Sequence, residues 1–178
     1  MNLPNKLTTG RMVMVPFLVL FMVTGYGGAA NRWICLAIFC GASITDWLDG
    51  YIARRDHLVT SYGKFMDPLA DKLLVCSAMI CLVGQQRLPS WVAAIIIGRE
   101  FIISAFRLIA AENGIVIAAN LWGKAKTVVQ MMMIILLLLD WPGLQVLETA
   151  AIYLSVLLTI VSLVTYIYQN KKVLSMQE

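Results

Sequence analysis

Residues 43–72 read SITDWLDGYIARRDHLVTSYGKFMDPLADK and hold four aspartates within largely apolar surroundings. Asp46 and Asp49 are three residues apart, and Asp67 and Asp71 are four residues apart. On an α-helix, residues with either spacing lie on the same face. The stretch therefore predicts two helices that each present a pair of carboxylates.

The composition of the whole chain is that of a membrane protein. Of its 178 residues, 60% are hydrophobic and 13% are charged, whereas about a quarter of the residues in an ordinary soluble domain are charged. A helix needs about 20 apolar residues to cross a bilayer. We therefore expect an all-α integral membrane protein with six transmembrane helices and a single membrane-embedded domain over residues 1–178.

Apolar runs separated by polar, glycine or proline residues locate these helices. Their expected ranges are 11–27, 32–54, 66–84, 90–112, 121–140 and 145–168. Six spans put both termini on one side, and that side carries most of the basic residues, namely Lys6, Arg11, Arg54, Arg55, Lys64, Lys124, Lys126, Lys171 and Lys172. The positive-inside rule then predicts cytoplasmic termini, and this topology accounts for the net charge of +4 without a nucleic-acid partner.

The segment LPNKLTTGR at residues 3–11 permits two interpretations. Its mixture of leucines with polar and basic residues is typical of a short interfacial helix. It could equally be the capped start of the first span, with Thr8 or Thr9 as the N-cap. The apolar run that follows, with GGAA at residues 27–30, also resembles a signal peptide, but a retained first helix fits the same residues.

Both aspartate pairs are expected one or two turns inside the cytoplasmic boundary of the membrane. Unpaired carboxylates at that depth would repel one another, and each would lose hydration at a cost of several kcal/mol. Two divalent cations would cancel the four charges, and ligands that are all oxygen favour Mg²⁺ or Mn²⁺ over Zn²⁺. The alternative is a set of ion pairs with basic neighbours, namely Arg54, Arg55, Lys64 and Lys72.

The residues around the aspartates favour a phosphate ligand. Gly50 and Ala53 continue the face of the first pair by one turn, and Gly63 lies one turn before the second pair. Small side chains there let a ligand approach the backbone. Arg54 supplies a planar fork of donors that suits phosphate. Together with paired cations, this arrangement favours a diphosphate site.

With these residues, the stretch resembles the signature of the CDP-alcohol phosphatidyltransferases. DWLDGYIAR, eight further residues and then GKFMDPLAD match the family pattern DxxDGxxAR, eight residues, GxxxDxxxD at every fixed position of residues 46–71. The resemblance implies a metal-dependent integral membrane enzyme, usually a homodimer. Such an enzyme transfers a phosphatidyl group from CDP-diacylglycerol to an alcohol and releases CMP.

The resemblance also implies roles for individual residues. It assigns a site for two divalent cations to Asp46, Asp49, Asp67 and Asp71, and it makes Asp71 the catalytic base. It assigns the binding of CDP-diacylglycerol to Gly50, Ala53, Arg54 and Gly63.

Three further segments resemble the phosphatidylglycerophosphate synthases within this family, whose alcohol is sn-glycerol 3-phosphate. They are PNKLTTGR at residues 4–11, GREFIISAFR at residues 98–107 and GKAKT at residues 123–127. Other members of the family use inositol, inositol phosphate, serine, choline or phosphatidylglycerol, and these remain alternative acceptors. The resemblance to bacterial enzymes implies the inner (cell) membrane, with the active site on the cytoplasmic side.

Three basic residues are expected to bind the phosphate of the acceptor: Arg107, Lys124 and Lys126. Arg107 lies well inside the fourth span, where a charge needs a partner. The two lysines open the fifth helix without an acidic residue nearby in the sequence, and residues two apart on a helix do not share a face. In the alternative interpretation, Arg107 pairs with Glu100 and the lysines only set the topology.

Two other classes of protein share part of this pattern. Intramembrane prenyltransferases also hold magnesium and a diphosphate with aspartate-rich helices, but their motifs are spaced differently and their chains are longer. Ion or proton transporters also carry Asp and Arg inside the membrane, but they usually show internal repeats or broken helices. Release of CMP from CDP-diacylglycerol by the purified protein would separate a transferase from both.

Overall fold

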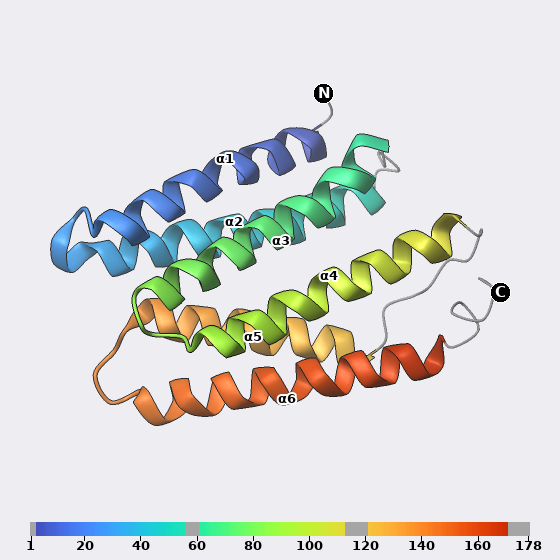
Figure 1. Cartoon of the computed structure of the whole chain (residues 1–178). Helices are drawn as coiled ribbons and strands as arrows, with labels where there is room; N and C mark the ends of the chain where they lie inside the picture. The colour runs from blue at the N-terminus through green and yellow to red at the C-terminus, as the bar shows by residue number, and fades with distance from the viewer. Residues whose placement is uncertain (1–2, 56–60, 113–120, 171–178) are drawn as a thin grey trace. The chain divides into compact units, whose positions relative to one another are not determined.

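The computed structural model describes residues 3–55, 61–112 and 121–170 (Figure 1). They form six α-helices, and the described residues contain no strand: α1 (Leu3–Thr24), α2 (Asn31–Arg55), α3 (Ser61–Gly84), α4 (Ser90–Glu112), α5 (Leu121–Leu139) and α6 (Gln145–Gln169), with a short 3-10 helix, η1 (Gly28–Ala30), before α2. The prediction of an all-α fold with six helices is confirmed. Both ends of α4, α5 and α6 agree with the predicted ranges to within one residue, whereas α1 and α3 begin earlier than predicted.

Helix α1 begins at Leu3 and includes the segment for which the sequence allowed two interpretations. Thr8 and Thr9 lie inside this helix, and Thr8 is fully buried. The interpretation in which one of them is the N-cap is therefore wrong. Pro4 does not prevent the early start, because it falls in the first turn, where a backbone N–H has no partner within the helix.

The helices form two compact units. Unit 1 comprises residues 1–87 and 134–141, and unit 2 comprises residues 88–133 and 142–178. Unit 1 thus contains α1, α2, α3 and the end of α5, and unit 2 contains α4, most of α5 and α6. The single domain over residues 1–178 stays a prediction.

In unit 1, helix α1 packs against both α2 and α3 (Figure 1). Its buried residues Arg11, Val15, Leu18 and Met22 recur at intervals of three or four, so they form one face of the helix. The turn after α1 contains Gly25, Gly27 and Gly28, all with positive φ. Such a conformation costs glycine little, and it lets α2 run back along α1.

In unit 2, helices α4 and α6 pack against each other. The ring of Phe106 meets the buried ring of Tyr166 edge to face, with centroids 6.1 Å apart. The buried face of α6 also carries Ser155, Thr159 and Ser162. Small polar residues of this kind are common where membrane helices meet, because they allow close approach and hydrogen bonding.

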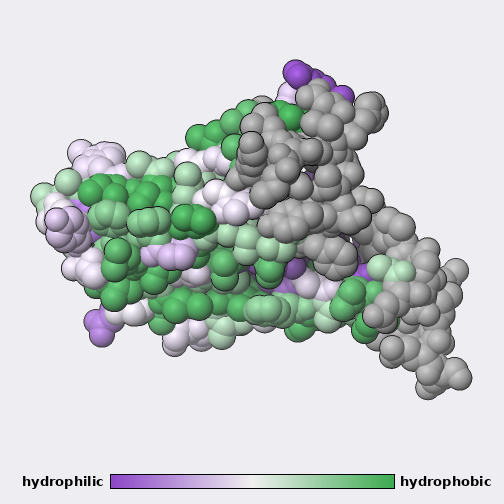
Figure 2. Space-filling model, turned by 90° about the horizontal axis from the view of Figure 1, so that it is seen from above, coloured by the Kyte–Doolittle hydropathy of each residue, from purple (hydrophilic) through white to green (hydrophobic). Residues whose placement is uncertain are grey.

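The described surface is rich in exposed apolar side chains, and Figure 2 shows hydrophobic residues in green over much of the face in view. Among the described residues, three helical segments are long and apolar enough to cross a membrane: Leu7–Thr24, Leu121–Leu139 and Gln145–Gln169. Helices α2, α3 and α4 each contain several charged residues, which lower their mean hydropathy. Exposed apolar surface on this scale is typical of helices that face lipid.

Candidate active site

Two of the four signature aspartates have described side chains, and both lie in unit 1. Asp46 lies nine residues before the end of α2 at Arg55, and Asp71 lies ten residues after the start of α3 at Ser61. Both are half-buried. Helices α2 and α3 contact each other and both pack against α1, and the two carboxylates lie at similar numbers of residues from the end of α2 and the start of α3.

The other predicted residues of this site belong to the same two helices, but their side chains lie outside the described ones. These are the aspartates Asp49 and Asp67 and the predicted CDP-diacylglycerol contacts Gly50, Ala53, Arg54 and Gly63. Their roles stay predictions.

A buried arginine on α1 faces the first signature aspartate. The Nη1 group of Arg11 donates a hydrogen bond to Oδ1 of Asp46 and forms an ion pair with it. The Arg11 side chain is 0% exposed, whereas that of Asp46 is 39% exposed. The guanidinium therefore approaches the carboxylate from the protein interior and fixes its orientation.

From the sequence, Arg11 is expected only to help set the topology, so its role beside Asp46 was not predicted. A stronger signal was available, because Arg11 directly precedes the apolar run of the first span and a charge at that position needs a partner. The sequence could not identify the partner, since Asp46 lies 35 residues away.

We expect the stabilities of Arg11 and Asp46 variants to be coupled. Breaking a buried ion pair by removing one partner costs about 3–5 kcal/mol, and the partial exposure of Asp46 reduces that cost. Arg11→Met and Asp46→Asn should each lower the thermal unfolding midpoint of the purified protein in a metal chelator. The double variant should lose less than the sum of the two, because both single variants break the same ion pair. Additive losses would contradict the coupling.

The Arg87–Asp140 pair provides the matched control. Its side chains are 22% and 66% exposed, and pairs exposed to this degree contribute about 0–1 kcal/mol. The cycle formed by Arg87→Met and Asp140→Asn should therefore show a smaller coupling than the cycle at Arg11 and Asp46.

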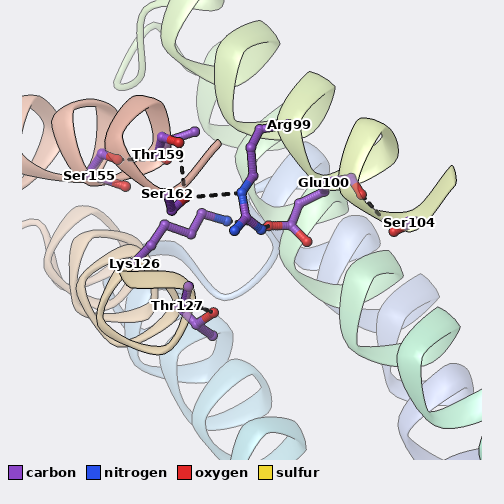
Figure 3. A network of polar contacts seen from close by, with 9 residues as sticks. Arg99, Glu100, Ser104, Lys126, Thr127, Ser155, Thr159 and Ser162 are labelled. Atoms are coloured by element: carbon purple, nitrogen blue, oxygen red, sulfur yellow. Dashed lines mark hydrogen bonds and ion pairs between the residues drawn. The ribbon is translucent and has the colours of Figure 1, made fainter. Parts of the chain in front are cut away.

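Unit 2 contains a buried polar network that links its three helices (Figure 3). Lys126 on α5, only 2% exposed, forms an ion pair with Glu100 on α4, which also pairs with Arg99 at 3.0 Å. Arg99 donates through Nε to Ser162 Oγ on α6 at 3.2 Å. Within the described contacts, the network joins two cations to one carboxylate.

This network corrects one expectation about the acceptor residues. Lys126 was expected to lack an acidic partner, but it pairs with Glu100. The ion pair between Glu100 and Arg107 that was the alternative is not what the described side chains form, because Arg107 is exposed and its guanidinium lies 5.9 Å from the centre of the Tyr166 ring. This partner could not be predicted from the sequence, because Lys126 and Glu100 lie 26 positions apart on different helices.

The two lysines point in different directions, as their spacing predicted. Lys126 is buried and Lys124 is exposed. Lys124 lies three residues after the start of α5, and Arg107 lies five residues before the end of α4. Both therefore flank the connection between these two helices. Their role in binding an acceptor stays a prediction.

Comparison with known proteins adds the deciding observation. A sequence model described as CDP-alcohol phosphatidyltransferase matches residues 1–161, which include both helices of the aspartate signature. The chain belongs to the CDP-alcohol phosphatidyltransferase family. It is therefore a membrane-embedded transferase, as its signature indicated.

Relatives in this family match nearly the whole chain. One from Bacillus subtilis, named CDP-diacylglycerol–glycerol-3-phosphate 3-phosphatidyltransferase, is 39% identical over 95% of this chain and 95% of its own length. One of the same name from Haemophilus influenzae is 40% identical over 96% and 94%. A probable phosphatidylglycerophosphate synthase from Mycobacterium tuberculosis is 41% identical over 93% of this chain and 80% of its own length.

CDP-alcohol phosphatidyltransferases use divalent metal ions, and the donor set here fits such ions. Asp46 and Asp71 offer half-buried oxygen ligands on adjacent helices, as hard cations prefer. Within the described side chains, no group of three or more His, Cys, Asp or Glu could hold a metal. This result concerns only two of the four signature carboxylates, because the side chains of Asp49 and Asp67 are not among those described.

Proposed function

We propose that this protein transfers a phosphatidyl group from CDP-diacylglycerol to sn-glycerol 3-phosphate, giving phosphatidylglycerophosphate and CMP. The observation that carries the proposal is the complete aspartate signature on α2 and α3 of a chain that belongs to the CDP-alcohol phosphatidyltransferase family. The names of the relatives support glycerol 3-phosphate as the acceptor.

The signature aspartates would hold the cations and orient the donor. Two divalent cations, Mg²⁺ or Mn²⁺, bound by the four carboxylates would neutralise the diphosphate of CDP-diacylglycerol and acidify the acceptor hydroxyl. Arg11 keeps Asp46 in a fixed orientation, so that this carboxylate is preorganised for its ligand. Gly50, Ala53 and Gly63 leave room for the nucleotide, and Arg54 binds phosphate.

In the reaction, the acceptor hydroxyl oxygen attacks the phosphorus that bears diacylglycerol. A new P–O bond forms, the P–O bond to CMP breaks, and CMP leaves with the bonding electrons. Asp71 accepts the hydroxyl proton. Positioning and charge stabilisation carry most of the rate enhancement, as in other transfers of phosphorus groups.

The acceptor phosphate would bind to exposed cations of unit 2. Arg107 and Lys124 are exposed, so they can contact a mobile dianion. The charge of Lys126 is already shared with Glu100, so we assign it a positioning role in which it holds the start of α5.

We expect Arg107→Ala and Lys124→Ala each to raise the KM for glycerol 3-phosphate tenfold or more, or about 1.4 kcal/mol, because each removes a direct phosphate contact. Lys126→Ala should raise it less, and the KM for CDP-diacylglycerol should change little in all three variants. Val128→Ala, at an exposed apolar side chain on the same helix as Lys124, serves as the control and should leave both KM values unchanged. The measurement is initial-rate kinetics of CMP release with each substrate varied in turn.

Two results would overturn the choice of acceptor while leaving the family assignment in place. One is an unchanged KM for glycerol 3-phosphate in all three variants. The other is comparable turnover with an uncharged alcohol such as inositol or serine. We further propose a homodimer in the bacterial inner membrane with the active site on the cytoplasmic side, which cross-linking and labelling from one membrane side can test.

A further inference from the structure

Unit 1 contains a cavity of about 530 Å³ beside the segments that follow α1, α3 and α5. Its wall includes the turn after α1, the start of α2, Gln85 and Arg87 after α3, and the end of α5 up to Asp140. This volume falls within the range of sites that bind small ligands, about 300–1,000 Å³. Polar and apolar side chains both line it, including Asn31, Arg32 and Leu137.

The cavity is separate from the aspartate site. Arg32 is the second residue of α2, and Asp46 lies fourteen residues further along the same helix, or about 21 Å at 1.5 Å per residue. The predicted topology places the α1–α2, α3–α4 and α5–α6 turns on the membrane side opposite the termini. Binding of a ligand in this cavity therefore does not depend on the proposed transferase function.

The charges around the cavity favour an anion. Arg87 pairs with the Asp140 carboxylate at 3.0 Å and also donates to the backbone oxygen of Leu137. Arg32 makes one hydrogen bond among the described residues, a long one of 3.4 Å to the backbone oxygen of Asp140. The described lining contains two arginines and one carboxylate, and Arg87 forms the ion pair with that carboxylate, so Arg32 has no carboxylate partner among these residues.

Two tryptophans hold this arginine in place. The Arg32 guanidinium carbon lies 5.5 Å from the ring centre of Trp33 and 5.7 Å from that of Trp141, and the two indoles meet edge to face. Both distances lie within the range of cation–π attraction, about 6 Å. This attraction uses no N–H group, so the guanidinium keeps donors for the paired hydrogen bonds that phosphate accepts. Tryptophans are enriched at the depth of lipid headgroups.

We propose that this cavity binds a phosphate group, with Arg32 as its principal donor. This phosphate group would belong either to the headgroup of an anionic phospholipid or to free phosphate. A position among interfacial tryptophans, with apolar lining beside the arginines, favours the lipid headgroup. In the alternative, Arg32 and Arg87 only connect the ends of the helices through Asp140, and the affinity for a ligand does not depend on them.

Native mass spectrometry of the purified full-length protein in detergent can measure this binding. The probes are dioleoylphosphatidylglycerol, the zwitterionic dioleoylphosphatidylcholine and, in a separate arm, inorganic phosphate alone and as a competitor. We expect Arg32→Gln to raise the Kd for dioleoylphosphatidylglycerol tenfold or more and Arg32→Lys to retain part of the affinity. Binding of dioleoylphosphatidylcholine should be weak in every variant.

Asp140→Asn is the discriminating variant, because a purely structural role and a ligand role predict different results. Asp140 has a φ of 47°, a conformation that asparagine tolerates well, so the turn should persist. Removal of the carboxylate makes the cavity more positive, and the Kd should fall several-fold. Circular dichroism and size-exclusion elution establish that each variant is folded.

The measurements distinguish a lipid headgroup from free phosphate, and both from a purely structural role of Arg32 and Arg87. Tight binding of dioleoylphosphatidylglycerol that millimolar phosphate does not displace supports the lipid headgroup, and binding of inorganic phosphate alone with the same Arg32 dependence supports free phosphate. If neither ligand responds to Arg32→Gln in folded protein, or if Asp140→Asn fails to strengthen binding, the proposal is overturned.

Discussion

Asp46→Asn, Asp49→Asn and Asp67→Asn should each abolish CMP release from CDP-diacylglycerol, with a loss of about a thousandfold or more. Each substitution removes a charged oxygen ligand, and bound cations of this kind contribute several kcal/mol to stabilising the transition state. A loss of about 4 kcal/mol corresponds to about three orders of magnitude in rate. Removal of Mg²⁺ and Mn²⁺ by a chelator should have the same effect on the unmodified protein.

Asp140→Asn is the matched control, because it makes the same chemical change at an exposed aspartate outside the signature. It should retain full activity. Binding of Mn²⁺, measured by electron paramagnetic resonance, should weaken in the three signature variants and not in the control. If any of the three kept near-normal activity at ordinary magnesium concentrations, that residue would not be a metal ligand.

Asp46→Asn should differ from the other two variants in one respect. It also removes the ion pair between the fully buried Arg11 and the Asp46 carboxylate, so the protein should lose stability as well as activity. In the double variant with Arg11→Met, we expect the stability to recover in part and the activity to stay lost. This pattern would separate the ligand role of Asp46 from its structural role.

Gly50→Leu should abolish the binding of CDP-diacylglycerol and leave the protein folded and inserted. The sequence places Gly50 on the helical face that continues from Asp46 and Asp49, and a leucine side chain there would occupy the space proposed for the nucleotide. The measurement is equilibrium binding of labelled CDP-diacylglycerol to the purified variant. Intact binding would refute the proposed pocket.

Gly41→Leu provides the control for this experiment. Gly41 lies on the same helix, and apart from its chain neighbours and the nearby backbone of α2 no atom lies within 4 Å of the place that a Cβ would take. The substitution should therefore be accommodated, with substrate binding preserved. A loss of binding in both variants would indicate a general intolerance of α2 to side-chain bulk.

The sequence by itself determined the helices, the family and the candidate catalytic carboxylates. Apolar runs and their polar breaks are local properties, so the ranges of α4, α5 and α6 could be predicted almost to the residue. The spacing of Asp46, Asp49, Asp67 and Asp71 is also local, and it was specific enough to indicate the CDP-alcohol phosphatidyltransferases. The start of α1 was placed too late, because the polar segment before the apolar run gave no hydropathy signal.

Only the tertiary structure decided which charges meet. Arg11 pairs with Asp46 across α1 and α2, Glu100 pairs with Lys126 across α4 and α5, and Arg32 lies beside Trp141 near the end of α5. These contacts join residues 35, 26 and 109 positions apart. Helical periodicity gives the relative directions of side chains on one helix. It does not give which helices are neighbours or how each is rotated about its axis, because both follow from packing of the whole buried surface.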